Sequence, residues 1–541
     1  MEFDYVIVGS GSAGSILADR LTANGRYTVC VLEAGPSDYR NPFIHFPAGF
    51  FKLLDNPAVN WVYHTEPEAQ TKGRRILYPR GRVLGGSSSI NGVMQVRGQR
   101  EDYDDWAAMG AHGWSYEEVL PYFKRSETYL PGDPKYRGKS GPLIVEEYTG
   151  HHPLTHDFVK AGQQLGMTFN PDYNGAFQEG IGYVQQTRSG RWRMSTARAF
   201  LRPAMKRPNL KVETGVMVTS LNYSGNRVSG VTFERRSSGS ATVGQPVPVT
   251  AKRETIICGG AINSPQLLQL SGIGDPEHLK SIGVDVKVAL PGVGFNFHDH
   301  YVARVVRTVV GRTTVNELSR GPRLALEVAK WTLLGKGILT YSAGNGIAFW
   351  RSKPELTRPD VQISFAPASY PNGQIGKLDT TPGMTCGAWQ CRPESRGSVL
   401  AKSKDPREAP AIKPNYLDHE TDKAAIVAGL KLCREIVNAP AFHACGGPEM
   451  YPGKDIQTDD EWLDYAYQFG GTVYHPVGTC KMGTDRMAVV DPELRVHGIA
   501  GLRVVDASVF PKMTSSNTNA PTMMIAEKAS DMILAAAETP A

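Results

Sequence analysis

The sequence predicts a mixed α/β fold, in which a nucleotide-binding sheet is assembled from separated segments and carries an inserted second domain. Three observations support this prediction. An apolar run at residues 6–8 leads directly into a glycine-rich turn and a helical pattern. A strand ending in glycines or in an acid recurs at residues 254–261 and 501–506. With 541 residues, the chain also exceeds what one hydrophobic core usually organises.

The first element is the turn G-x-G-x-x-G, formed by Gly9, Gly11 and Gly14, with a helix expected over about residues 15–24. Gly9 permits a tight turn, Gly11 lets the backbone approach a pyrophosphate, and Gly14 allows close packing of the helix. Standing alone, such a motif is weak evidence, because most glycines in loops only mark turns.

The next strand places an acid where a dinucleotide needs one. Residues 27–32 are apolar and β-branched, and Glu33 follows them, nineteen residues after Gly14. A carboxylate there can accept hydrogen bonds from a ribose 2′-OH. The order strand, glycines, helix, strand and acid therefore predicts a Rossmann-type domain that binds a dinucleotide, with NAD and FAD left as alternatives.

The middle of the chain continues this domain. Strand-like residues 212–223 and 228–234 flank a turn at 224–226, which predicts a β-hairpin. Residues 254–261 then repeat the strand that ends in glycines, and residues 264–270 look helical.

The C-terminal block supplies a further strand at 501–506 and a helix that Pro521 opens and that runs to about residue 536. Between the blocks, strand-like runs such as 361–365 and 398–400 lack glycine fingerprints and are assigned to a cap domain with an antiparallel sheet. We expect a discontinuous nucleotide-binding domain at residues 1–150, 205–305 and 470–541, and a substrate-binding cap at 151–204 and 306–469.

Composition excludes several classes of protein. The net charge of +6 is spread along the chain without a Lys/Arg block, so no nucleic-acid partner is expected. The sequence contains no run of about 18 apolar residues, so no integral membrane segment is predicted. The seven cysteines form no C-x-x-C pair, which argues against zinc and favours a reducing, cytoplasmic location. Peripheral attachment to the inner membrane stays open, and the oligomeric state is not predicted.

Specific motifs then identify a family. Residues 81–91 (GRVLGGSSSIN) resemble the first signature of the glucose–methanol–choline (GMC) oxidoreductases, and residues 260–274 match the second. Further matches are residues 294–300, 392–397, 475–476 and 517–519, in the family's order. The resemblance covers nearly the whole chain and is greatest to bacterial choline-dehydrogenase-like and sorbose-dehydrogenase-like alcohol oxidoreductases.

The resemblance implies FAD, which is expected to be bound non-covalently because Ile90 stands where covalently flavinylated members have a histidine. Gln95 departs from the family's aromatic or alanine, which puts the packing near the flavin in question. Together with the glycine turn, the resemblance places FAD against Gly9, Gly11, Ser12, Ala13, Gly14, Glu33, Ala34, Arg82, Gly85, Gly86, Ser87, Asn91, Gly92, Val93, Val218, Asp506, Ala507, Asn519 and Thr522.

Two residues are expected to carry the chemistry. Alcohol oxidation needs a base with a pKa near neutrality, and histidine suits this task. His475 lies in a segment that resembles the family's catalytic segment, so it is predicted to be the base. Asn519 is predicted to orient the substrate oxygen, and the alternative reading is a helix cap before Pro521.

Other candidates receive structural interpretations. His298 and His300 have the spacing of metal ligands but lack a third ligand, and the resemblance makes them structural, so no metal is predicted. Cys480 is expected to be buried and inert. The aromatic residues between Phe43 and Trp61 fit either a lid over the cofactor or ordinary core.

The predicted activity is oxidation of an alcohol CH–OH group to a carbonyl, with a small-molecule alcohol as substrate. Oxygen, a quinone or an artificial dye are open as electron acceptor. A hydroxynitrile-lyase-like enzyme of the same fold is the alternative, and a non-enzymatic nucleotide-binding module is the second rival. Choline is disfavoured, because no aromatic cage with an acid is identifiable in the sequence.

Overall fold

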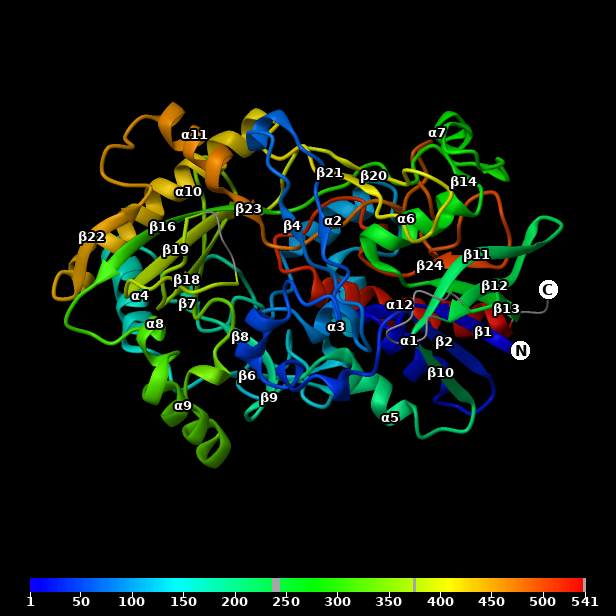
Figure 1. The fold of residues 1–541 in the computed structure, drawn as a ribbon, viewed down its shortest axis with the longest axis horizontal. Helices are drawn as coiled ribbons and strands as arrows, with labels where there is room; N and C mark the ends of the chain where they lie inside the picture. Colours follow the sequence, from blue (N-terminus) through cyan, green and yellow to red (C-terminus); the bar gives the residue numbers. More distant parts are fainter. Residues whose placement is uncertain (236–243, 373–375, 539–541) are drawn as a thin grey trace.

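A seven-stranded sheet organises the nucleotide-binding domain of the computed structural model, which describes residues 1–235, 244–372 and 376–538 (Figure 1). The strand order is β10-β2-β1-β13-β12-β11, and β24 pairs with β13. Strands β10, β2, β1, β13 and β24 are parallel, whereas β11 and β12 extend the sheet as an antiparallel hairpin. Their bounds are β1 Glu2–Val8, β2 Val29–Glu33, β10 Leu210–Thr214, β11 Val216–Ser224, β12 Arg227–Arg235, β13 Val247–Ile257 and β24 Leu502–Val504.

The helices behind this sheet come from both ends of the chain. Helix α1 packs against α12, which in turn packs against α3 (Figure 1). The bounds are α1 Ser12–Thr22, α3 Tyr116–Ser126, α6 Gly260–Leu270 and α12 Asn519–Glu538. The predicted hairpin and the predicted helices after each glycine turn are thus confirmed, with ends shifted by a few residues.

An antiparallel sheet forms the cap, as predicted. Its order is β22-β16-β19-β18-β17-β7, with β23 pairing with β16, and helix α10 covers β16, β18 and β19. The bounds are β7 Gly180–Tyr183, β16 Tyr301–Val309, β17 Gly346–Trp350, β18 Val361–Ala366, β19 Gly383–Gln390, β22 Gly446–Tyr451, β23 Gly471–Thr472, α4 Pro153–Gln164, α10 Glu420–Asn438 and α11 Asp459–Phe469.

Two details differ from the expectation. Strand β16 begins at Tyr301, so the cap sheet starts a few residues before the expected boundary at residue 305. The strand at Ser398–Leu400 (β20) pairs with Ala411–Lys413 (β21) in a separate two-stranded sheet.

The remaining elements are short. The strands are β3 Tyr63–His64, β4 Leu77–Tyr78, β5 Glu127–Thr128, β6 Leu143–Glu147, β8 Gln185–Ser189, β9 Trp192–Arg193, β14 Ile273–Gly274 and β15 Val288–Ala289. The helices are α2 Arg100–Ala108, α5 Arg202–Ala204, α7 Pro276–Ser281, α8 Val315–Leu318 and α9 Gly321–Leu334, and single turns include η3 Pro47–Lys52 and η5 Gly86–Ser89.

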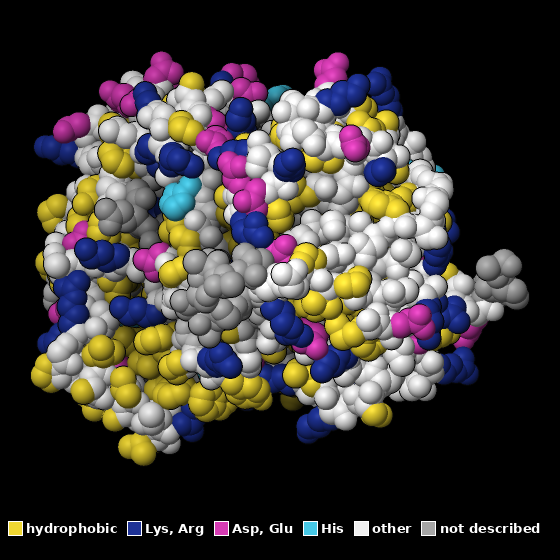
Figure 2. All heavy atoms as spheres, turned by 45° about the vertical axis from the view of Figure 1, so that its right-hand side comes forward, with side chains coloured by type: hydrophobic (Ala, Val, Ile, Leu, Met, Phe, Trp, Pro, Cys, Tyr) yellow, Lys and Arg dark blue, Asp and Glu magenta, His cyan; other side chains and the backbone are white. Residues whose placement is uncertain are grey.

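Each domain has its own apolar core, and one helix stands apart from both. Helix α9 lies at the lower edge of the molecule in Figure 1, and Figure 2 shows hydrophobic side chains gathered along the corresponding lower edge. Leu326, Leu333 and Leu334 of α9 are 58%, 78% and 66% exposed. This helix therefore contributes little to either core.

Candidate active site

One cavity of about 380 Å³ joins the two domains. Its floor on the nucleotide side consists of Val8, Leu32 and Ile257, at the carboxyl ends of the parallel strands β1, β2 and β13. This is the edge where parallel α/β sheets bind their ligands. On the opposite side, the cavity reaches the antiparallel cap sheet and His475.

The glycine turn has the geometry that a pyrophosphate requires. Gly9 has φ +97°, and a Cβ on it would lie 2.5 Å from the carbonyl oxygen of Cys258. A Cβ on Gly14 would lie 2.0 Å from the carbonyl oxygen of Gly9. Helix α1 has Gly11 as its N-cap and no side-chain cap, so its first N–H groups stay available to an anion.

Two buried carboxylates hold the loops around this end of the cavity. Glu33 accepts hydrogen bonds from the Ser10 backbone N–H and Oγ at 2.9 and 2.7 Å, and from the Gly35 N–H at 2.8 Å. Asp506 accepts from the Gly260 N–H at 2.8 Å and from Ser264 Oγ at 2.6 Å. Burial raises the pKa of both carboxyl groups, and these hydrogen bonds offset part of that rise.

Most of the residues predicted to bind the cofactor line this cavity. They are Gly9, Gly11, Ser12, Ala13, Glu33, Ala34, Gly86, Ser87, Asn91, Gly92, Val93, Val218, Asp506, Ala507, Asn519 and Thr522. Gly14, Gly85 and Arg82 do not. Gly14 and Gly85 face other protein atoms, and Arg82 donates to the carbonyl oxygen of Pro57 at 2.8 Å and lies over the ring of Trp61.

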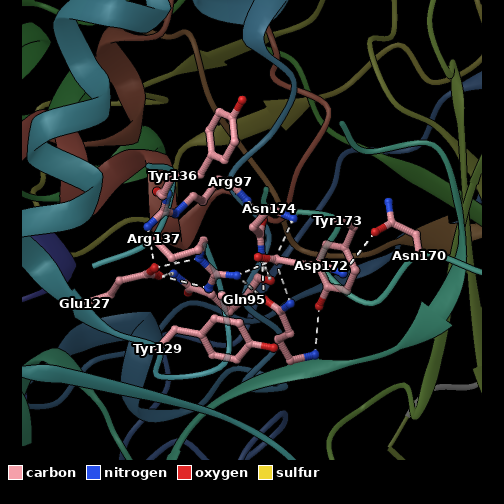
Figure 3. Close-up of polar contacts among 12 residues, drawn as sticks. Gln95, Arg97, Glu127, Tyr129, Tyr136, Arg137, Asn170, Asp172, Tyr173 and Asn174 are labelled. Carbon is pink, nitrogen blue, oxygen red and sulfur yellow. Dashed lines mark hydrogen bonds and ion pairs between the residues drawn. The ribbon is translucent and has the colours of Figure 1, made fainter. Parts of the chain in front are cut away.

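Gln95 belongs to a buried polar cluster rather than to the cavity wall (Figure 3). Its Nε2 lies 3.4 Å from Glu127, and Arg137 donates to Glu127 at 2.7 Å. Arg97 forms a second ion pair with Glu127, and Arg137 also pairs with Asp172. Burial would raise the pKa of Glu127, but the two guanidinium groups bring it below its ordinary value. The amide at position 95 therefore borders a buried charged network, and its own Oε1 is buried without a hydrogen-bond partner among the described residues.

His475 lies at the opposite end of the cavity and is 8% exposed. Its backbone N–H donates to Asp299 Oδ1 at 2.8 Å. Asp299 Oδ2 accepts from Thr472 Oγ1 at 2.6 Å, from the Tyr78 hydroxyl at 2.7 Å and from the Tyr416 hydroxyl. Because three segments of the chain converge on this carboxylate, the backbone of His475 is firmly placed.

His300 determines which nitrogen of His475 faces the cavity. His300 Nε2 lies 2.7 Å from the carbonyl oxygen of Cys391, and His300 Nδ1 lies 2.9 Å from His475 Nδ1. A carbonyl oxygen only accepts, so His300 carries its proton on Nε2 and accepts at Nδ1. Assigned from this network, His475 carries its proton on Nδ1 and leaves Nε2 unprotonated, as a hydrogen-bond acceptor.

Burial keeps both imidazoles neutral. It lowers the pKa of His300 to about 4, and it lowers the pKa of His475 well below the ordinary value, with further contributions from the charges of His300 and Arg80. A neutral imidazole with an unprotonated Nε2 is the form that accepts a proton.

The amide next to His475 is that of Asn517. Asn517 Nδ2 lies 3.0 Å from His475 Nε2, and Gln362 Nε2 donates to Asn517 Oδ1 at 3.4 Å, which fixes the orientation of the amide. Asn519 is the first residue of α12, and its Oδ1 accepts from Ser12 Oγ of α1 at 2.6 Å. Because α12 packs on α1, Asn519 lies at the glycine turn, and Asn517 is the amide beside His475. The role predicted for Asn519, orienting the substrate oxygen, stays a prediction.

Most of the other side chains that the sequence analysis singled out are buried or line the cavity. Both ring nitrogens of His298 are buried and have no hydrogen-bond partner within the described ranges. Cys480 is buried, as expected, and burial raises the pKa of its thiol. Between residues 43 and 61, Phe50, Phe51 and Trp61 line the cavity, whereas Phe43 is 38% exposed.

The part of the chain that the structure describes contains no cluster of three or more His, Cys, Asp or Glu suited to a metal ion. We also find no helix able to span a bilayer in residues 1–235, 244–372 and 376–538.

The cap sheet contributes cavity-lining residues that the sequence analysis did not single out. They alternate along three strands, with Val302 and Arg304 on β16, Ser364 and Ala366 on β18, and Thr385, Gly387 and Trp389 on β19. A strand turns every second side chain to the same face. The period-two pattern that starts at His300 was the available signal for the β16 residues.

Family models and relatives agree on one classification. The GMC oxidoreductase models match residues 3–302 and 393–526. An oxygen-dependent choline dehydrogenase of Brucella suis biovar 1 (strain 1330) is 43% identical over 538 residues, which are 99% of this chain and 96% of that protein. A protein of the same name from Rhizobium rhizogenes (strain K84 / ATCC BAA-868) is 41% identical over the same shares.

Solved structures have the same fold. Pyridoxine 4-oxidase from "Mesorbium loti" matches with a TM-score of 0.86 and 28% identity, over 98% of each chain. The R554A variant of Aspergillus oryzae RIB40 formate oxidase matches with a TM-score of 0.91 and 26% identity, over 99% of this chain and 98% of that chain. Because both family models match this chain and its relatives match it over nearly their full length, the chain belongs to the GMC oxidoreductase family.

Proposed function

We propose that this enzyme oxidises an alcohol to a carbonyl compound with FAD, and that His475 is its catalytic base. The observation that carries the proposal is the imidazole whose unprotonated Nε2 lies beside the Asn517 amide in the cavity that joins both domains. Relatives named choline dehydrogenase and structures of named oxidases support an oxidoreductase of small molecules.

The cofactor is FAD, and the residues present fit it. The cavity runs from the glycine turn, with its uncapped helix N-terminus, past Glu33 and Asp506 to the cap sheet. A dinucleotide needs this combination of backbone N–H groups and carboxylates. When bound, FAD supplies the acceptor for the hydride that leaves the carbinol carbon.

The side chains of the protein handle the proton. His475 Nε2 takes the proton from the alcohol oxygen, and the hydrogen bond between His475 Nδ1 and His300 keeps the ring in the required tautomer. For this transfer, the Asn517 N–H group that donates to His475 Nε2 gives way to the substrate hydroxyl, and the amide can then donate to the substrate oxygen while the base acts. Asp299 holds the backbone of His475 in place.

Anaerobic mixing with alcohols tests the activity directly. A panel of primary and secondary alcohols should bleach the flavin absorbance of the purified holoenzyme, and an acceptor panel of oxygen, quinones and dyes should restore it. A holoenzyme that no alcohol bleaches would contradict the proposal. No observation favours the hydroxynitrile lyase alternative.

A further inference from the structure

Arg304 brings an unpaired guanidinium to the cap side of the cavity. It lies on β16, and both it and Val302 line the cavity. Its carbonyl oxygen accepts from the Tyr465 hydroxyl at 2.7 Å, which anchors the backbone. Its guanidinium, however, makes no hydrogen bond or ion pair with any residue that the structure describes.

The other arginine at this end of the cavity is already engaged. Arg80 donates to the carbonyl oxygen of Tyr474 at 2.7 Å and to that of Pro79 at 2.5 Å. The bond to Tyr474 helps to hold this residue in the left-handed region, with φ 69°. Of the two arginines that line the cavity in the described part of the chain, Arg304 is therefore the one that remains available to a ligand.

Two tyrosine hydroxyls accompany Arg304. Tyr370 and Tyr474 line the cavity with Arg304, and their hydroxyls have no hydrogen-bond partner among the described residues. Burial raises the pKa of each phenol to about 12, so both stay protonated and can donate. One guanidinium and two phenols thus present hydrogen-bond donors to the same region.

Among the residues that the structure describes, no carboxylate lines the cap end of the cavity. Glu33 and Asp506 are the acids that line the cavity among the described residues, and both belong to the nucleotide end, where their oxygens are already hydrogen-bonded. Burial lowers the pKa of Arg304, because a desolvated cation without a counter-charge is unfavourable. An anionic ligand would supply the missing charge.

We propose that Arg304, together with Tyr370 and Tyr474, binds the carboxylate of a hydroxy acid whose hydroxyl group faces His475. This inference rests on the proposed alcohol oxidation and narrows its substrate class. A carboxylate matches the planar guanidinium in a bidentate arrangement and carries one charge, as Arg304 does. Among the described residues, no lysine lines the cavity to balance a doubly charged phosphate.

The position of Arg304 on the strand sets the length of the substrate. His300, which contacts His475, precedes Arg304 by four residues, or roughly 13 Å between Cα atoms at the usual rise of a strand. We therefore expect the hydroxyl and the carboxylate of the substrate to be several carbon atoms apart. Gly387 faces Arg304 across the sheet and leaves room for its side chain, since a Cβ there would lie 3.2 Å from Arg304 Cγ.

Ligand binding tests the anion site without turnover. The flavin absorbance of the holoenzyme is titrated with butanoate, neutral butanamide and cationic tetramethylammonium. We expect butanoate to bind at least about tenfold more tightly than butanamide, and this preference to disappear in Arg304→Met and to be partly kept in Arg304→Lys. Tighter binding of tetramethylammonium than of butanamide, or an undiminished butanoate preference in Arg304→Met, would overturn the inference.

Kinetics provide the second test. The ratio of kcat/KM for 6-hydroxyhexanoate to that for hexan-1-ol should exceed about ten in the wild type and fall to one or below in Arg304→Met. Arg323→Met, on the exposed helix α9, is the matched control and should keep the wild-type ratio. Choline should be a poorer substrate than 3,3-dimethylbutan-1-ol, its neutral analogue, and the reverse order contradicts the inference. The flavin content and the melting temperature of each holoenzyme are measured, so that misfolding can be excluded as the cause of a lost preference.

The proposed alcohol oxidation and the proposed anion site can be contradicted independently of each other. If butanoate binds through Arg304 but no alcohol bleaches the flavin, the alcohol oxidation is wrong and the anion site stands. If neutral alcohols bleach the flavin and Arg304→Met leaves every preference unchanged, the oxidation stands and the assigned substrate class is wrong.

Discussion

The Nδ1 atoms of His300 and His475 lie 2.9 Å apart, where a strand of the cap meets the C-terminal segment. His300 is in turn held through Nε2 by the carbonyl oxygen of Cys391. A backbone group of the cap thus determines, through His300, the tautomer of the proposed base. His300 is a positioning residue, because it acts through His475.

His300→Ala should therefore lower kcat by about tenfold or more and leave KM and flavin content nearly unchanged. His300→Gln should recover part of the loss, because an amide can donate to the Cys391 oxygen and accept from His475. Steady-state kinetics of the three holoenzymes check this. Equal losses in both variants would show that His300 only fills space.

The pH dependence should reveal His475 as a base with a lowered pKa. Burial lowers this pKa well below 6.5, so the neutral form that accepts a proton exists at pH 7 and above. We expect kcat/KM to be constant around neutrality and to fall only as the pH drops through the lowered value. His475→Ala should lose about a hundredfold in turnover and lack this acid limb, and a limb that persists in the variant would belong to another group.

Asn517 and Asn519 offer a matched pair of substitutions. Asn517→Ala removes the amide beside His475 and should lower kcat by about tenfold to a hundredfold while FAD stays bound. Asn519→Ala removes the partner of Ser12 at the glycine turn and should weaken FAD retention more than turnover. Stopped-flow flavin reduction and equilibrium dialysis measure the two effects. The reverse pattern would return the catalytic role to Asn519.

Flavin release should show how the cofactor is held. Ile90 lines the cavity at the position of the histidine in covalently flavinylated members of the family, and a hydrocarbon side chain forms no bond to the flavin ring. Acid precipitation should therefore leave all of the flavin in the supernatant. Yellow colour that remains with the protein pellet would disprove non-covalent binding.

The charged network around Glu127 (Figure 3) should determine how the free energy of unfolding changes at acid pH. Glu127→Gln leaves Arg97 and Arg137 buried without their shared carboxylate, which should cost about 3–5 kcal/mol in the free energy of unfolding. The folded-state pKa of Glu127 is lowered, so its stabilisation is present above pH 4.5, its unfolded value, and is lost as the pH falls through the folded pKa.

Denaturant unfolding of the holoenzyme from pH 7 downward measures this loss. Glu179→Gln, which breaks a pair with the exposed Arg351, serves as the control and should change stability little. A variant Glu127→Gln as stable as the wild type at pH 7 would mean that the network contributes no net stability.

The sequence was most informative where local chemistry determines local structure. The turn from Gly9 to Gly14 and the acid at position 33 predicted the first βαβ unit, because only glycines fit those close backbone contacts. Alternating apolar residues and a short turn likewise predicted the hairpin of β11 and β12. The cofactor end of the cavity follows from such local signals.

The chemical end could not be predicted in the same way, because it depends on which residues meet in space. Asn517 and Asn519 are two residues apart, and only the packing of α12 on α1 decides which of them faces His475. The surroundings of Arg304 could not be predicted either, because they depend on the register of β16 against β19 and on the placement of Tyr370 and Tyr474. Neither spacing nor propensity encodes these long-range contacts.

The pairing of β13 with β1 on one side and β24 on the other has a consequence for biosynthesis. At usual translation speeds, roughly 12–50 s separate the emergence of β1 from that of β13, and β24 leaves the ribosome later still. A nascent chain that lacks its last forty residues has neither β24 nor α12, so it presents an unfinished sheet edge to chaperones. Asp506 and Asn519, which line the cofactor end of the cavity, lie in this same segment, so we expect FAD to be captured only after the segment has emerged.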